Sequence, residues 1–154
     1  MALGATPILL YDGVCGLCNR FVQFTLSRDR DAVFRFAPLQ SPRALDILRR
    51  YGIDRVQNDT VVVVLDYETP NEQLLFRSDA ALFVLNHCAA PWPLLARLGA
   101  RIPRPVRDAL YRCIARHRYR LFGRYHACPL PDPEARSRFL DLESGTRPED
   151  QIVE

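Results

Sequence analysis

The sequence predicts an α/β fold in which a small mixed sheet carries helices on both faces. Short aliphatic runs alternate with stretches of helical periodicity up to about residue 88, and two of these runs are apolar on both sides, as expected for central strands. A turn-rich stretch between the last two runs predicts a hairpin. Together these observations predict the order β-α-β-α-β-β-α.

The first strand is expected at residues 8–11, because Ile-Leu-Leu-Tyr is too short and too continuously apolar to be half-exposed. A helical pattern follows over about residues 19–27. Cys15 then lies at the first turn of this helix, directly after a buried strand.

The next two elements are a strand and a capped helix. Residues 33–37 have strand character, and Pro38 ends that strand. Ser41 and Pro42 suit the N-cap and the first position of a second helix, and Gly52 suits its C-cap. The pattern therefore predicts a short amphipathic helix between these residues.

The strongest strand is at residues 60–65, and the turn-rich segment 66–72 joins it to another at residues 73–76. Ser78 and Asp79 are expected to cap a third helix. This order is the minimal thioredoxin-like layout, which predicts a four-stranded mixed sheet with strand order 2-1-3-4.

We divide the chain into residues 1–90, a thioredoxin-like core, residues 91–142, a C-terminal helical extension packed on the core within the same domain, and residues 143–154, a flexible polar tail. The longest helix of the extension is expected to begin near Pro103 and to end at Gly123. Its apolar stripe is expected to be buried. The stripe consists of Val106, Leu110, Cys113, Ile114, His117 and Leu121.

Composition is that of an ordinary globular protein, with 48% hydrophobic and 25% charged residues in 154. The sequence shows no signal-peptide pattern and no run of the roughly 18 apolar residues that a membrane span needs, so we expect a cytoplasmic protein with no membrane span.

All 21 basic residues are arginines, and nine lie between Arg97 and Arg124. Such a cluster could bind nucleic acid or an anionic membrane surface, but we interpret it as a solvated helix face and expect no nucleic-acid partner.

The five cysteines, an odd number, argue against a disulfide framework. Cys15 and Cys18 are spaced to share one side of a helix, and the positive end of the helix dipole favours a thiolate at Cys15. We therefore predict a redox pair in which Cys15 attacks a disulfide and Cys18 resolves the mixed disulfide. Gly13 and Gly16 allow another backbone to approach the pair closely.

Two further interpretations concern the surroundings of this pair. Asp12 is a candidate proton relay for the thiols, although we favour a role in capping the helix or another structural role. The alternative function is a zinc-binding or protein-interaction module, in which Cys15 and Cys18 are metal ligands and the arginine-rich helix contacts a partner. Cys113 and His117, spaced i, i+4, would be further ligands, as would His126 and Cys128. Because a second CxxC and an HxxxH motif are both lacking, we expect no metal.

Four segments of the chain resemble the DCC family of predicted thiol-disulfide oxidoreductases, which is regarded as thioredoxin-like and is named after its DxxCxxC pattern. The segments are Asp12-Gly13-Val14-Cys15-Gly16-Leu17-Cys18, Phe36-Ala37-Pro38-Leu39-Gln40-Ser41, Arg77-Ser78-Asp79-Ala80 and the region from Arg118-Tyr119-Arg120 to Cys128. The resemblance runs from about residue 7 to residue 140. It implies thiol-disulfide oxidoreductase activity, with Asp12, Cys15 and Cys18 as the residues carried over by position.

The resemblance also suggests where a substrate would bind. Thioredoxin-like proteins usually place a cis-proline just before the third strand, facing the cysteines. Here that position lacks a proline, and Asp59 and Thr60 become candidate substrate-binding residues. Arg77 and Ser78 are further candidates, because the corresponding helix start holds the carboxylate of glutathione in glutaredoxin-like proteins. A plain N-cap is the alternative role for Ser78.

Cys128, in a proline-rich loop, is a candidate third redox thiol, with docking of the loop as the equal alternative. We expect a protein or small-molecule disulfide or thiol as substrate and no bound cofactor. Glutathione or a thioredoxin-type reductant is the expected electron donor. The oligomeric state is left open.

Overall fold

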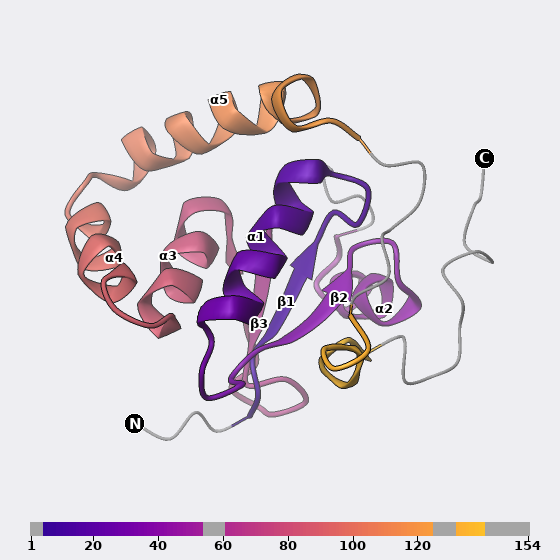
Figure 1. Cartoon of the computed structure of the whole chain (residues 1–154). Helices are drawn as coiled ribbons and strands as arrows, with labels where there is room; N and C mark the ends of the chain where they lie inside the picture. The colour runs from indigo at the N-terminus through magenta and orange to yellow at the C-terminus, as the bar shows by residue number, and fades with distance from the viewer. Residues whose placement is uncertain (1–4, 54–60, 125–131, 141–154) are drawn as a thin grey trace.

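A computed structural model describes residues 5–53, 61–124 and 132–140, and Figure 1 shows the whole chain. Its centre is a four-stranded sheet in the order β2-β1-β3-β4. The strands are β1 (Ile8–Tyr11), β2 (Arg35–Pro38), β3 (Val62–Leu65) and β4 (Gln73–Phe76). β1 is parallel to β2 and antiparallel to β3, and β3 and β4 form an antiparallel hairpin. The predicted α/β class, the mixed sheet and the strand order are confirmed, and they agree with a thioredoxin-like fold.

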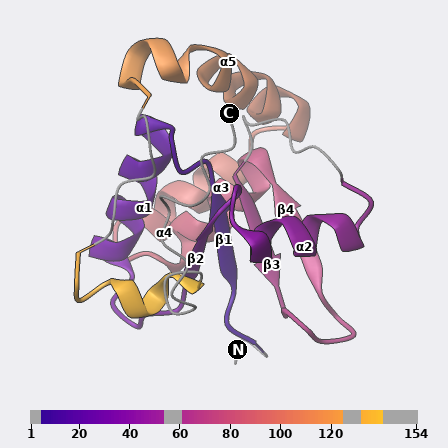
Figure 2. The same ribbon diagram turned by 90° about the vertical axis from the view of Figure 1, so that its right-hand side faces the viewer.

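Helices cover both faces of the sheet, because successive side chains of β1 point to opposite sides. Leu9 and Tyr11 pack in one apolar cluster with residues of α1 (Gly16–Arg28) and α3 (Arg77–His87). Ile8 and Leu10 pack in a second cluster with α2 (Pro42–Arg50). Figures 1 and 2 show α1 and α2 on opposite sides of β1.

Ser41 is the N-cap of α2, as predicted, and its side chain accepts a hydrogen bond from the Ala44 N–H over 3.2 Å. The helix ends at Arg50 with Tyr51 as its C-cap, so Gly52 lies one residue beyond the cap position that we predicted for it. Its φ of +70° is a conformation that suits glycine. Local sequence chemistry therefore suffices to define both ends of this helix.

Two helices form the extension. α4 (Trp92–Ala100) packs against α3, and α5 (Arg104–Phe122) arches over the ends of α1 and α3 (Figure 1). After α5, the described residues 132–140 contain a 3₁₀ turn (Arg136–Arg138). Asp29 at the end of α1 binds the Arg138 guanidinium and accepts hydrogen bonds from the backbone of Val33 and Phe34. This buried carboxylate ties the late segment to the core.

The orientation of α5 also corrects the sequence prediction. The apolar stripe that we expected in the core faces outward, with Val106 50% and Leu110 58% exposed, and Cys113 and His117 are exposed as well. The side of α5 that faces α1 and α3 instead carries mainly polar side chains. These residues are Arg107, Asp108, Tyr111, Ala115, Arg118 and Tyr119. The helix is turned this way because the buried Asp12 carboxylate beneath it requires polar partners, which Arg118 and Tyr119 supply.

Candidate active site

The two cysteines lie where β1 passes into α1, at the carboxyl end of a central strand. Cys15 is the N-cap of α1, and its Sγ accepts a hydrogen bond from the Cys18 N–H over 3.4 Å. Asn19 braces the loop, because its side-chain amide donates to the carbonyls of Gly13 (2.8 Å) and Cys15 (2.9 Å). The helix begins three residues earlier than we predicted, so the cysteine takes the cap position itself.

The two thiols have opposite acidities. The hydrogen bond from the Cys18 thiol, the backbone N–H groups of Leu17 and Cys18, and the charge of Arg118 lower the pKa of Cys15 to about 6 against the opposing effect of burial. The bond to Cys15 raises the pKa of Cys18 well above its ordinary value, and burial and the nearby negative charges of Cys15 and Asp12 act in the same direction. At neutral pH the pair therefore holds one thiolate, on Cys15, and one proton, on Cys18.

Asp12 anchors the cysteine loop to two other parts of the chain. Its Oδ1 accepts from the Val14 N–H (3.2 Å) and from Gln40 Nε2 (2.9 Å) in the loop after β2. Its Oδ2 binds Arg118 Nη2 (3.1 Å) and the Tyr119 hydroxyl (2.5 Å), both on α5. The carboxylate is only 1% exposed. All of these contacts are consistent with a structural role for Asp12 in holding the loop, which the sequence analysis gave as the alternative to a proton relay.

Three of these partners were missed by sequence reasoning. Arg118 was counted with the solvated arginines, yet it is 4% exposed and its guanidinium also contacts the Tyr119 hydroxyl over 2.9 Å. Burial and the bond to Asp12 raise the pKa of Tyr119 to about 12, which keeps the phenol a hydrogen-bond donor. Gln40, Arg118 and Tyr119 all fall in segments that carried the family resemblance, and that was their only signal in the sequence.

The end of α5 covers the cysteine loop. The Gly16 N–H donates to the Gly123 carbonyl over 3.1 Å, and Cys15 pairs with Arg124 as an isolated antiparallel bridge. A Cβ atom on Gly16 would lie 2.1 Å from the Phe122 carbonyl oxygen. The backbone that approaches Gly16 closely thus belongs to the chain itself, and it leaves Cys15 with no exposed surface.

A cavity of about 270 Å³ lies beside Cys18, between α1, α3 and α5. Its wall is almost entirely apolar, and Ile114 and Ala115 of α5 contribute to it. Tyr111 also lines it, and its hydroxyl accepts a hydrogen bond from the Val61 N–H over 2.9 Å. The sulfur pair therefore borders an apolar space on its Cys18 side.

The start of α3 differs from the prediction. The N-cap is Phe76 and no side chain caps the helix, so the assignment of Ser78 and Asp79 as caps is wrong. Ser78 is buried, and its hydroxyl donates to Asp108 Oδ1 over 2.5 Å, while Arg77 has a φ of +52°. The serine bond lowers the pKa of Asp108. The carboxylate at this helix start is thus one from α5.

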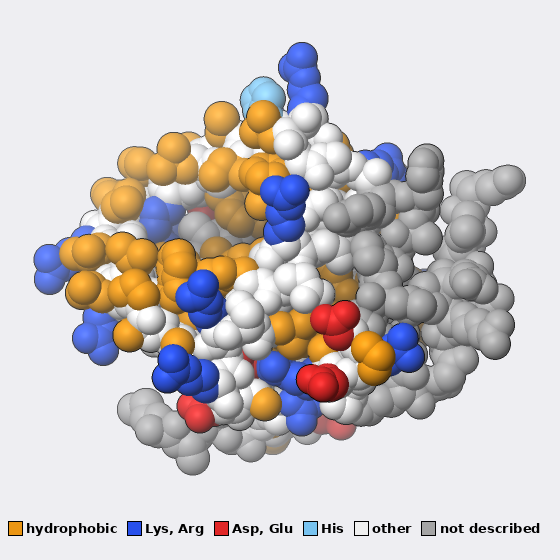
Figure 3. Space-filling model, in the orientation of Figure 1, with side chains coloured by type: hydrophobic (Ala, Val, Ile, Leu, Met, Phe, Trp, Pro, Cys, Tyr) orange, Lys and Arg blue, Asp and Glu red, His pale blue; other side chains and the backbone are white. Residues whose placement is uncertain are grey.

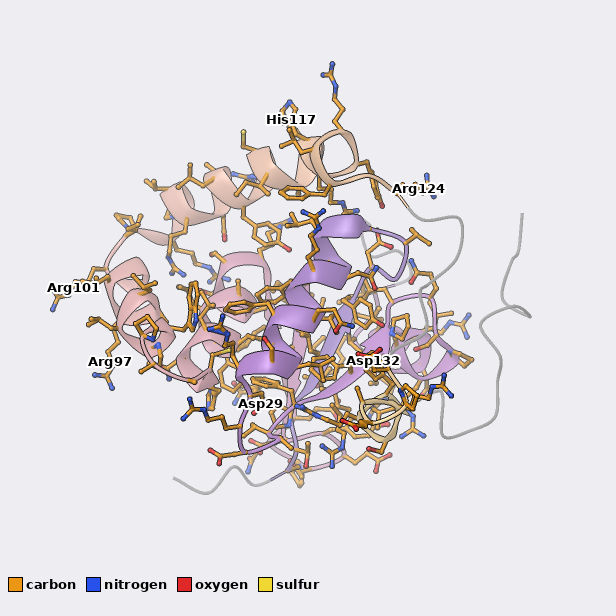
Figure 4. All side chains as sticks on the ribbon, viewed as in Figure 1. Asp29, Arg97, Arg101, His117, Arg124 and Asp132 are labelled. Carbon is orange, nitrogen blue, oxygen red and sulfur yellow. The ribbon has the colours of Figure 1, made fainter. Side chains whose placement is uncertain are left out.

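Figure 4 labels Asp29, Arg97 of α4, and Arg101 and Arg124, which lie just beyond the ends of α4 and α5. Asp59, Thr60 and Cys128, which we named as candidates, lie outside the described residues, as does the position at which thioredoxin-like proteins carry their cis-proline. Within the described ranges, no group of three or more His, Cys, Asp or Glu side chains is placed to hold a metal ion.

The fold and the position of the pair define a class: α/β proteins that present a CxxC at the start of a helix, after a central strand. Within this class, the chain belongs to the DCC1-like thiol-disulfide oxidoreductase family, whose model matches residues 9–124. No solved structure matches the chain.

Two relatives share 40% of their aligned residues with the chain. One is the uncharacterized protein YuxK of Bacillus subtilis (strain 168), over 133 residues, which are 86% of this chain and 93% of the relative. The other is the chloroplastic DCC family protein At1g52590 of Arabidopsis thaliana, over 124 residues, which are 80% of this chain and 69% of the relative. In the described part of the chain, every helix is too short or too polar to cross a lipid bilayer.

Proposed function

We propose that the chain catalyses dithiol-disulfide exchange through Cys15 and Cys18. The observation that carries the proposal is the asymmetric pair, in which the Cys18 N–H and thiol both donate to a low-pKa Cys15 sulfur. The Cys15 thiolate attacks one sulfur of a substrate disulfide, forms a mixed disulfide and expels the other sulfur as a thiolate. Cys18 then loses its proton and attacks Cys15, which releases the second substrate thiol and leaves an oxidised pair. Two electrons pass to the substrate, and a reductant must return them.

The same contacts explain why Cys18 stays protonated until Cys15 has reacted. Its pKa is raised first by the bond to Cys15, then by burial and by the charge of the Cys15 thiolate. When Cys15 enters a mixed disulfide, the bond and the charge both disappear, so the Cys18 proton leaves more easily. Resolution is thereby favoured only after the first attack has occurred.

Access to the pair limits its substrates. Because Cys15 has no exposed surface, exchange requires the backbone at Gly123 and Arg124 to move away from it. The apolar cavity beside Cys18 suits a disulfide that carries apolar groups. At the start of α3, Asp108 already takes the place expected for a glutathione carboxylate. We therefore propose a dithiol of thioredoxin type, ahead of glutathione, as the electron donor, and the cytoplasm as the location.

Trapping of mixed disulfides tests the assigned roles. Cys18→Ser is expected to accumulate a mixed disulfide with an apolar peptide disulfide, because the resolving sulfur is gone, whereas Cys15→Ser is not. Cys113→Ser, which removes an exposed thiol outside the site, is the matched control and should behave as the parent protein. Equal trapping by both active-site variants would contradict the roles.

Metal content of the purified protein separates this proposal from the zinc-module alternative. The proposal requires a Cys15–Cys18 disulfide that forms in an oxidising glutathione buffer and is reversed in a reducing one. Stoichiometric zinc held by both cysteines, with no reducible disulfide, would instead establish a metal-ligand pair.

A further inference from the structure

The outer side of α4, α5 and their connection exposes a cluster of aliphatic side chains, which we call the α4–α5 surface. Its members are Leu94, Leu95, Leu98, Ile102, Val106, Leu110, Ile114 and Leu121, each 40% to 71% exposed. Over the described residues, only Leu45 and Tyr51 are large hydrophobic side chains exposed to this extent elsewhere. Figure 3 shows hydrophobic side chains gathered over α4 and α5. Such a concentration on one side of a protein marks an interaction surface.

Arginines border the α4–α5 surface. Among the described residues, Asp79 and Asp108 pair with Arg104 at the N-terminal end of α5, and Asp79 also pairs with Arg107. Arg112, Arg116 and Arg120 are four residues apart, so they form a row along α5 beside the aliphatic residues. Arg97 and Arg101 extend outward from the α4 end of the surface (Figure 4). The segment from residue 92 to residue 124 contains one acidic residue, Asp108, which is turned inward to Ser78. The surface therefore combines exposed aliphatic groups with an excess of positive charge.

This combination discriminates between partners. A second copy of the chain, docked through the same surface, would bring rows of arginine close to one another, which like-charge repulsion disfavours. An anionic lipid surface satisfies both components, since aliphatic side chains enter the acyl boundary while guanidinium groups bind headgroup phosphates. Helices that lie in a membrane interface carry this pattern of aliphatic and arginine faces.

We propose that the α4–α5 surface binds the face of an anionic membrane, with α4 and α5 lying along it. Ile114 belongs to this surface and also lines the cavity beside Cys18, so binding would bring the cavity close to the lipid. If the proposed redox function holds, this position favours substrates that are themselves bound at the membrane. The docking itself does not depend on that function.

Vesicle co-sedimentation of the full chain tests the proposal. We expect binding to vesicles of phosphatidylcholine mixed with phosphatidylglycerol, little binding to phosphatidylcholine alone, and a decrease of binding with added salt. Leu110→Ser combined with Leu121→Ser should abolish binding, while Leu45→Ser, which changes a leucine of α2 that is 40% exposed, should not. Arg116→Gln combined with Arg120→Gln should weaken binding by about tenfold or more, with Arg49→Gln on α2 as the control.

Three outcomes would overturn the proposal. These are absence of binding to both kinds of vesicle, equal binding to both, and a dimer in light scattering that Leu110→Ser with Leu121→Ser dissociates. The last result would make the surface an interface between two copies. Mixed-disulfide trapping by Cys18→Ser in the same leucine variant separates the two proposals, because it tests the redox pair whether or not the membrane is bound.

Discussion

The two sides of α5 reverse the usual arrangement of an amphipathic helix. Its inner side buries Arg118 against Asp12 and Tyr119 and holds Asp108 against Ser78. Its outer side exposes Val106, Leu110, Ile114 and Leu121. Hydrophobic periodicity therefore identifies the apolar face of a helix, but it does not determine whether that face packs against the core or is exposed. Here the polar face is the one that contacts the core, because it completes the cysteine site.

The largest expected effect comes from breaking the inner side. Arg118→Met leaves the Asp12 carboxylate buried without its cation, and we expect a loss of about 3–5 kcal/mol in the free energy of unfolding, measured with urea. Arg116→Met, on the exposed side, should change stability by less than about 0.5 kcal/mol. Replacing Asp12 by Leu in addition to Arg118→Met should restore part of the loss, and a fully additive double variant would contradict the pairing.

A smaller effect is expected where the end of α5 meets the cysteine loop. Gly16→Ala puts a methyl group 2.1 Å from the Phe122 carbonyl oxygen, and we expect a loss of about 1–3 kcal/mol. The same change should push the covering backbone away, so that iodoacetamide alkylates Cys15 faster. Gly99→Ala is the control, because its Cβ meets only the flexible Leu82 side chain. An unchanged alkylation rate would show that this backbone does not protect Cys15.

The third effect depends on pH. The pKa of Cys15 is lowered from its ordinary value of 9.0 to about 6, so between these values the unfolded chain binds more protons than the folded one. The free energy of unfolding of the reduced protein should therefore rise with pH, by up to ~1.4 kcal/mol per unit. This contribution is complete above pH 9 and is lost as pH falls through 6. Comparison with Cys15→Ser isolates it, and a difference that stays flat over this range would contradict the low pKa.

The smallest effect on stability is expected on the outer side of α5. Leu110→Ser removes a side chain that is already 58% exposed, so we expect a change within about 0.5 kcal/mol in urea unfolding. Ala115→Ser, on the buried side of the same helix, is the comparison and should cost more, since it places a hydroxyl at a position that is 8% exposed. A reversed order of the two losses would mean that α5 is turned the other way.

Most of the fold was predictable because its signals are local. The aliphatic run at residues 8–11 predicts β1, and Ser41-Pro42 predicts the start of α2. Each signal lies in or next to the element that it predicts. Predictions failed where a local preference lost to tertiary contacts: the serine at the start of α3 turned to Asp108, thirty residues away, instead of capping its own helix.

The site was predictable in part for the same reason. Cys15 and Cys18 follow from a spacing of three at a strand-to-helix junction, which a single turn of chain determines. Gln40, Arg118 and Tyr119 meet Asp12 across 28, 106 and 107 positions of sequence, and spacing carries no information about such contacts. The cover over Cys15 and the cavity beside Cys18 likewise depend on where α5 packs.

The sequence by itself determined the order of the elements, the sheet that they form and the dithiol at the end of the first strand, because hydrophobic periodicity and turn chemistry act between near neighbours. Only the tertiary structure decided that α5 presents its polar side to the cysteines and its aliphatic side to the surroundings. That choice rests on buried charges, which are stable only where distant parts of the chain bring donors and acceptors together.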